Sequence, residues 1–148
     1  MDLIRHILVA TDFSADTEEA QRVAANLAKQ LDAEITLLHV YEPVAWAVPD
    51  GYMLYTPDQM SELLAEADRL LALGKARLET SGVRKASTKL VQGIVAVEVV
   101  EEAARGKYDL LIVGTHGRTG VSHAVMGSIA EKIVRTARCP VLSVRSKK

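Results

Sequence analysis

The feature of this sequence that most constrains its fold is a regular alternation of short apolar runs and amphipathic stretches. The apolar runs are rich in Val, Ile and Leu and have the length of buried strands; they cover residues 5–10, 34–40, 88–91, 110–113 and 141–144. The intervening stretches repeat apolar residues at helical spacing, within residues 14–32, 60–82, 97–106 and 129–137. Such alternation predicts an α/β fold in which helices cover both faces of a doubly wound parallel sheet.

Size and composition narrow the class of protein. The chain has 148 residues, so we expect residues 1–148 to form a single domain. Cys139 is the only cysteine, which excludes a disulfide or a Cys-based zinc site within one chain. A formal net charge of −1 argues against nucleic acid as a partner. No apolar run approaches the ~20 residues that span a bilayer, and no signal-peptide pattern opens the chain. We therefore expect a cytoplasmic protein without membrane insertion.

Residues 41–57 interrupt the alternation. This segment contains three prolines, a glycine, four aromatic residues and no helical period. It is longer than most connections within a domain, so we interpret it as a long loop that serves as a lid or interface. Its aromatic rings either anchor the loop to the domain or contact a ligand or partner.

The apolar run at 110–113 leads into a loop that is rich in glycine, and a helical pattern follows. The loop begins Gly114-Thr115-His116-Gly117-Arg118-Thr119-Gly120 and closes on Gly127-Ser128. A strand, a glycine-rich loop and a helix N-terminus form a common phosphate-binding arrangement, because backbone N–H groups and the helix dipole converge on the anion. The loop lacks the Lys-Ser or Lys-Thr of a Walker P-loop. Its first two glycines are three apart, unlike those of the dinucleotide fingerprint.

The glycine spacing, Gly114-x2-Gly117-x9-Gly127-Ser128, resembles that of the universal stress protein family. The runs ILVATDFS at 7–14 and CPVLSV at 139–144 extend the resemblance over essentially the whole chain. In that family this spacing marks the ATP-binding branch. The resemblance implies a Rossmann-like sheet of five parallel strands in the order 3-2-1-4-5. It also implies a homodimer, formed through the edge strand at 141–145; an apolar edge strand that stays uncovered would promote association.

The resemblance also implies an ATP site. Asp12 would contact adenosine, the Val40 backbone would pair with the adenine edge, and the motif glycines and Ser128 would hold the phosphates. Ligands of doubly wound sheets bind beyond the carboxyl ends of the strands, so the residues after the first and fourth strands should be neighbours. The predicted nucleotide-binding set is Thr11, Asp12, Val40, Gly114, Thr115, Gly117, Arg118, Gly127, Ser128 and Ile129. We expect no metal site made by protein side chains, with Mg²⁺ or Mn²⁺ carried on the phosphates.

Several of these residues have a second interpretation. Asp12 can accept hydrogen bonds from ribose hydroxyls, or it can serve as a turn or cap residue. Arg118 can pair with a phosphate or lie in solvent. His116 can donate to a phosphate, although the sequence assigns it no carboxylate partner. We expect His6 and His39 to be satisfied residues within strands.

The sequence favours nucleotide binding over turnover. It lacks a Walker-type lysine, and no residue can be assigned to orient an attacking water, so we predict no catalytic residues. We expect an ATP-binding, nucleotide-responsive regulator of the stress response, with an unidentified protein partner and at most slow ATP hydrolysis or self-phosphorylation. Two alternatives remain: an ATPase or nucleotidyl transferase of the same fold, and an interaction module that binds no nucleotide.

Overall fold

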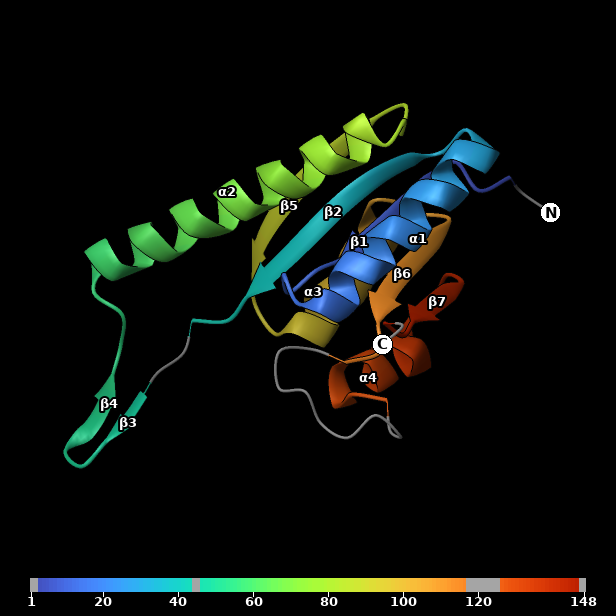
Figure 1. The fold of residues 1–148 in the computed structure, drawn as a ribbon. Coiled ribbons are helices and arrows are strands. Elements are labelled where there is room, and N and C mark those ends of the chain that lie inside the picture. Colours follow the sequence, from blue (N-terminus) through green and yellow to red (C-terminus); the bar gives the residue numbers. More distant parts are fainter. Residues whose placement is uncertain (1–2, 44–45, 117–125, 147–148) are drawn as a thin grey trace.

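A computed structural model describes residues 3–43, 46–116 and 126–146 (Figure 1). The helices and strands follow one another as β1 (His6–Ala10), α1 (Ala15–Leu31), β2 (Glu34–Tyr41), β3 (Trp46–Val48), β4 (Gly51–Met53), α2 (Pro57–Thr80), β5 (Ala86–Gln92), α3 (Val95–Arg105), β6 (Leu110–Gly114), α4 (Ser128–Thr136) and β7 (Val141–Val144). Within the described ranges no helix is long and apolar enough to cross a bilayer.

The main sheet confirms the predicted fold. Its strands lie in the order β5-β2-β1-β6-β7, and every neighbouring pair is parallel. Numbered along the chain within this sheet, the order is 3-2-1-4-5. The central strand β1 pairs through Ile7 with Ile35 of β2 and with Leu110 of β6. This register brings the carboxyl ends of β1, β2 and β6 to the same edge of the sheet.

Helices cover both faces of the sheet because successive strand side chains point to opposite sides. Ile7 and Val9 belong to a buried cluster that also contains residues of α1 and α2. Leu8, between them, belongs to a second cluster with residues of α3 and α4. The strands at the centre of the sheet are therefore apolar on both faces, as the continuous apolar runs predicted.

Local signals determine where the long helix α2 begins and how it packs. Thr56 and Gln59 form a reciprocal capping box, and Pro57 occupies the first turn. Gly74 lies inside this helix without breaking it. A Cβ atom at Gly74 would come 2.6 Å from Cδ2 of the buried Leu37, so glycine allows α2 to lie close to β2 at this point.

Residues 41–57 are not a loop throughout, as the sequence suggested, because they include a β-hairpin. β3 and β4 pair in antiparallel fashion, with Val48 opposite Gly51. Pro49 and Asp50 form the turn, and Gly51 follows with a φ of 138°. Proline presets the first turn position and glycine adopts the positive φ, so Pro49-Asp50-Gly51 was a turn signal within this segment. The hairpin lies away from the main sheet (Figure 1).

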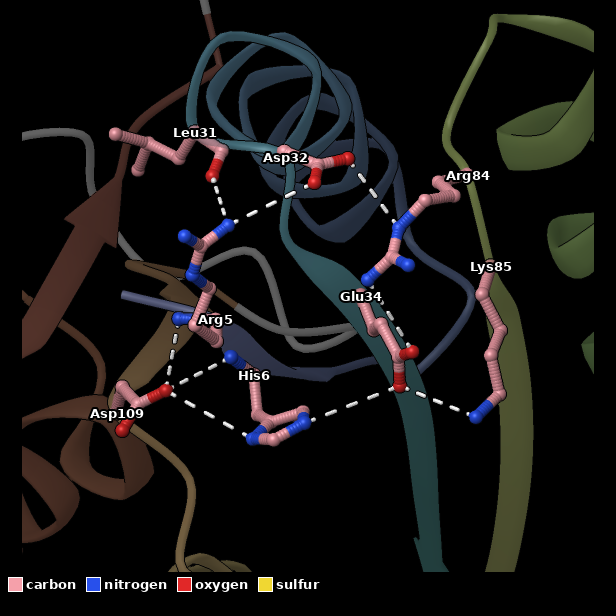
Figure 2. A network of polar contacts seen from close by, with 8 residues as sticks. All are labelled: Arg5, His6, Leu31, Asp32, Glu34, Arg84, Lys85 and Asp109. Atoms are coloured by element: carbon pink, nitrogen blue, oxygen red, sulfur yellow. Dashed lines mark hydrogen bonds and ion pairs between the residues drawn. The ribbon is translucent and has the colours of Figure 1, made fainter. Parts of the chain in front are cut away.

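A network of polar contacts joins the strands at the edge where β1, β2 and β5 begin (Figure 2). Oδ2 of Asp109 accepts hydrogen bonds from the backbone N–H groups of Arg5 and His6, each at 2.8 Å. The His6 ring lies between Asp109 and Glu34, 3.9 Å from a carboxylate oxygen of each. His6 is thus an exposed residue at the start of the central strand, with two acidic neighbours, and the network lies at the opposite end of the strands from the predicted nucleotide site.

Candidate functional site

A cavity of about 260 Å³ opens at the carboxyl edge of the sheet. It lies beside β1 and β6, which are adjacent in the sheet. The strand that follows β1 in the chain, β2, lies on one side of this pair, and the strand that follows β6, β7, lies on the other. This is the switch point at which doubly wound folds bind ligands. The lining residues are Ala10, Thr11, Asp12, Thr17, Leu38, Val40, Val95, Val99, Val113, Gly114, Thr115, His116, Gly127, Ser128, Ile129, Ala130 and Ile133.

Part of the apolar lining comes from the end of β2 and from α3. Leu38 and Val40 lie in the second half of β2, while Val95 and Val99 come from the first turns of α3. We call these four residues the apolar wall. Apolar lining with a few placed polar groups is typical of small-molecule sites, and it suits a flat, largely apolar ring system. Val40 of this wall was predicted from the sequence, whereas the α3 residues were not, because a helical period does not show which residues face a cavity.

Four further lining residues, Asp12, Thr115, His116 and Ser128, form what we call the polar wall. Oδ1 of Asp12 accepts hydrogen bonds from the Ser14 N–H at 2.9 Å and from Thr17 Oγ1 at 3.1 Å. Asp12 is therefore a turn residue that also lines the cavity, so its two interpretations are compatible. The turn is held from the β2 side as well, since Nδ1 of His39 donates to the Thr11 carbonyl at 2.7 Å.

The β1–α1 turn contains a residue in an uncommon conformation. Phe13 has a φ of 64°, in the left-handed region that side chains other than glycine seldom adopt. Its ring lies against the His39 ring, with centroids 4.5 Å apart, and its N–H donates to Thr11 Oγ1 at 3.0 Å. These contacts hold the turn in a single geometry and so fix the position of the Asp12 carboxylate.

Two glycines of the motif have clear packing reasons. A Cβ atom on Gly114 would lie 3.2 Å from the carbonyl carbon of Asp16 and from Cγ2 of Thr17. Glycine at the end of β6 therefore lets the first turn of α1 approach the cavity. A Cβ atom on Gly127 would lie 3.0 Å from the Thr115 carbonyl oxygen, which accepts the Gly127 N–H at 2.7 Å. That hydrogen bond joins the end of β6 to the start of α4.

His116 has a carboxylate partner that the sequence did not reveal. Its Nδ1 lies 3.2 Å from Oδ2 of Asp16, and only 10% and 16% of the two side chains are exposed. The same nitrogen lies 3.0 Å from Thr115 Oγ1. Asp16 belongs to the first turn of α1, 100 residues earlier in the chain, and only the packing of α1 on β6 brings the pair together.

The structure brings most of the predicted set to this cavity. Thr11, Asp12, Val40, Gly114, Thr115, Gly127, Ser128 and Ile129 all line it. Gly117 and Arg118 lie outside the described residues, so their predicted roles stay predictions. Gly127 is the N-cap of α4, and Ser128 is its first residue. A helix N-terminus at a cavity favours an anion, because N–H groups there lack partners within the helix.

Comparison with known proteins assigns the family. The model of the universal stress protein family matches residues 3–145. A universal stress protein of Methanocaldococcus jannaschii is 36% identical over 99% of this chain and 85% of its own. The chain belongs to the universal stress protein family. Its fold is similar to that of the solved universal stress protein UspA of Lactobacillus plantarum, with a TM-score of 0.82, 25% identity, and coverage of 98% of this chain and 100% of the other.

Three more distant structures of the family show the same fold and were solved with adenine nucleotides. One universal stress protein in complex with cAMP is 22% identical, with a TM-score of 0.75 over 99% of this chain and 100% of its own. An Archaeoglobus fulgidus protein with dAMP is 18% identical, with a TM-score of 0.70 over 97% and 99%. An Arabidopsis thaliana protein with AMP is 20% identical, with a TM-score of 0.64 over 97% and 92%.

Proposed function

We propose that this universal stress protein binds an adenine nucleotide, ATP in the first place, in the cavity at the carboxyl edge of its sheet. The observation that carries the proposal is the composition of that cavity. An apolar wall from β2 and α3 accompanies a polar wall with a carboxylate and a helix N-terminus. Family members solved with cAMP, dAMP and AMP support the same ligand class.

Each part of the nucleotide has a counterpart in this arrangement. The apolar wall suits the adenine ring, with the Val40 backbone at its edge. The Asp12 carboxylate, already oriented by Ser14 and Thr17, suits the ribose hydroxyls. Gly127 and Ser128 at the start of α4 suit the phosphates, together with Gly114, Gly117 and Arg118 of the motif.

The metal in this proposal is Mg²⁺ or Mn²⁺ carried by the nucleotide. Among the described residues no three His, Cys, Asp or Glu side chains are grouped closely enough to hold a metal ion. Among the described lining residues Asp12 supplies the one carboxylate, and Ser128 is one of four residues that carry a hydroxyl. A donor set of this size fits Mg²⁺ that keeps waters and phosphate oxygens as its other ligands. Bound in that way, the ion would offset phosphate charge beside the polar wall.

We further propose a nucleotide-responsive regulator of the stress response, acting in the cytoplasm as a homodimer through residues 141–145. Nucleotide binding would connect the β1–α1 turn to the β6–α4 junction, because the two lie on the same cavity. The hairpin of β3 and β4 supports a role in contacting a regulatory protein: it follows β2 in the chain, and Met53, the last residue of β4, is 59% exposed. At most slow hydrolysis or self-phosphorylation is expected.

Thermal denaturation with ATP and Mg²⁺ tests the binding proposal. A ligand at about 100 times its Kd adds roughly 2.7 kcal/mol of stability, which raises the Tm of a domain this size by roughly 5–11 °C. The wild type is compared with Asp12→Asn, a variant that keeps a side-chain oxygen for the turn and removes the negative charge. It should unfold like the wild type without ligand and show a smaller rise with ATP. No rise at millimolar ATP would contradict a competent site and favour the interaction module.

Product release separates the regulator from an enzyme of the same fold. With excess ATP, a regulator should convert less than one equivalent per chain over minutes. Multiple turnovers that Asp12→Ala abolishes would instead establish an ATPase or nucleotidyl transferase. The two results differ in the number of ATP molecules that each chain converts. A contaminating ATPase is recognised because its activity persists in Asp12→Ala.

A further inference from the structure

The buried side of α1 carries polar side chains in its first turns, where the rest of that side is apolar. Thr17 and Gln21 of α1 are only 6% and 9% exposed, and Thr11, which follows β1 directly, is 5% exposed. Further along the same side of the helix the buried residues are small and apolar: Ala20, Ala24, Ala25 and Ala28. Burying a polar group costs free energy unless the group is hydrogen-bonded, so the three polar side chains need partners within the fold.

Gln21, Thr11 and Thr17, which we call the Thr11 cluster, are joined by a series of hydrogen bonds that ends at the cavity. Nε2 of Gln21 donates to Thr11 Oγ1 at 3.3 Å, and Thr11 Oγ1 donates to Thr17 Oγ1 at 3.1 Å. The proton of Thr17 has two acceptors within reach, Asp12 Oδ1 at 3.1 Å and the Ser14 carbonyl at 3.0 Å. A carboxylate is the stronger acceptor of the two, so the series leads to Asp12.

Close packing restricts the two ends of the Thr11 cluster. A Cβ atom at Gly74 of α2 would lie 3.3 Å from Oε1 of Gln21. A Cβ atom at Gly114 of β6 would lie 3.2 Å from Cγ2 of Thr17. Glycine at these two positions lets α2 and β6 approach the cluster, which leaves its side chains little room for other rotamers. The cluster is therefore a rigid support for the Asp12 carboxylate.

We propose that the Thr11 cluster sets the preference of the cavity for a nucleotide with ribose hydroxyls, with Gln21 and Thr17 as positioning residues that act through Asp12. This inference rests on the proposed function, in which the Asp12 carboxylate receives those hydroxyls. Thr17 restrains Oδ1 of Asp12 from α1, and Gln21 restrains Thr17 through Thr11. Gln21 is not among the described residues that line the cavity, so its effect on a ligand passes through the cluster.

Isothermal titration with ATP and with 2′,3′-dideoxy-ATP, each with Mg²⁺, tests this inference. The dideoxy nucleotide keeps the base and the phosphates and lacks both ribose hydroxyls. A lost hydrogen bond to a charged acceptor weakens binding about tenfold or more, so the wild type should prefer ATP by at least that factor. Thr17→Val keeps the shape of the side chain without its hydroxyl, and it should reduce the preference to about threefold or less by weakening ATP binding alone. Thr17→Ser, which keeps a hydroxyl, should retain the preference.

Two further variants and a matched control assign the effect to the Thr11 cluster. Gln21→Leu removes the first donor and should also weaken ATP binding while the affinity for the dideoxy nucleotide stays unchanged. Asp12→Asn combined with Thr17→Val should bind ATP about as tightly as Asp12→Asn alone, because both changes act on one contact. The control is Thr36→Val, which removes a hydroxyl that lies 2.9 Å from Ser87 Oγ between β2 and β5. It should keep the full preference for ATP.

The outcomes distinguish this inference from the function on which it rests. A full preference for ATP in Thr17→Val or Gln21→Leu would overturn it, and so would an equal loss of affinity for both nucleotides, because the cluster would then only support the cavity structure. Additive losses in the double variant would also overturn it, since Thr17 would then contact the nucleotide itself. A wild type that binds both nucleotides equally would overturn the inference and leave nucleotide binding intact. A wild type that binds neither would overturn the proposed function.

Discussion

The N–H of Gly127 donates to the carbonyl of Thr115 at 2.7 Å and so joins the end of β6 to the first turn of α4. The two residues are far apart in the glycine motif, yet this bond makes them adjacent on the cavity. Thr115 in turn donates its N–H to the Val144 carbonyl at 2.9 Å. The junction is therefore tied to the edge strand β7, through which we propose the homodimer forms.

Gly127→Ala should weaken this junction. The added Cβ would lie 3.0 Å from the carbonyl that accepts the Gly127 N–H, so the hydrogen bond and the carbon compete for the same space. We expect a loss of about 1–2 kcal/mol in the free energy of unfolding and a weaker response to ATP. Urea unfolding and thermal shift measure the two effects. A variant that loses stability while its ATP response stays intact would show that the phosphates bind elsewhere.

Lys89→Met should destabilise the protein more than Lys85→Met. Lys89 forms an ion pair with Glu102, whose side chain is only 3% exposed, so the variant leaves a buried carboxylate with Arg105 as its remaining partner. We expect a cost of about 1–3 kcal/mol. Lys85 pairs with Glu34, which is more exposed, and its loss should cost less than about 1 kcal/mol. Equal costs in urea unfolding would show that the Lys89 pair is no more important than a surface pair.

Asp109→Asn should reduce stability in a manner that depends on pH. The hydrogen bond from the Arg5 N–H is the largest influence on the pKa of Asp109 and lowers it below its usual value. Burial opposes this effect, and the hydrogen bond from the His6 N–H acts in the same direction as that from Arg5. The carboxylate therefore contributes fully above its pKa in the unfolded chain, about 3.9, and this contribution is lost as the pH falls through the lower folded value.

The measurement is urea unfolding of the wild type and Asp109→Asn between pH 7 and pH 3. The difference in free energy of unfolding should be constant from pH 7 to about pH 5 and should close below about pH 4. A difference that grows on acidification would have the wrong sign for a carboxyl group with a lowered pKa. It would show that Asp109 prefers its protonated form in the fold.

Cys139 should react slowly with thiol reagents in the native protein. Burial raises the pKa of its thiol, which lowers the thiolate fraction, and the side chain is partly covered by the α3–α4 cluster. Because this is the only cysteine, the reaction of the whole protein reports on it directly. The rate with a chromogenic disulfide at pH 8 should be at least tenfold lower than in urea. Equal rates would show an open thiol.

The sequence predicted the main sheet well because that architecture follows from local periodicity. The continuous apolar run Ile7-Leu8-Val9 required a strand covered on both faces, and the alternation with helices required parallel neighbours. The hairpin in residues 41–57 was missed although Pro49-Asp50-Gly51 signals a turn. Three prolines in the segment outweighed that signal, and a strand of three residues has almost no periodicity to detect.

The candidate site was predictable where the motif residues carry it and unpredictable where packing creates it. Asp12 was predicted from the family resemblance and its position after the first strand, and Gly127 from the glycine spacing; both line the cavity. The Asp16–His116 contact depends on how closely α1 approaches β6, which Gly114 permits but no local pattern encodes. The position of Val99 in the cavity lining was missed for a similar reason. The apolar stripe of α3 faces both the core and the cavity, and the sequence pattern does not separate the two.

Equilibrium dialysis with radiolabelled ATP and Mg²⁺ tests the central claim most directly, using a variant that fills the cavity and a matched control. Val99→Phe places a ring among the residues of the apolar wall, whereas Val97→Phe adds the same bulk on the same helix at a position that is 40% exposed and does not line the cavity. We predict saturation at one nucleotide per chain for the wild type and Val97→Phe, with at least tenfold weaker binding by Val99→Phe. Val99→Phe that binds ATP as tightly as the wild type, or a wild type without saturable binding, would contradict a nucleotide site in this cavity.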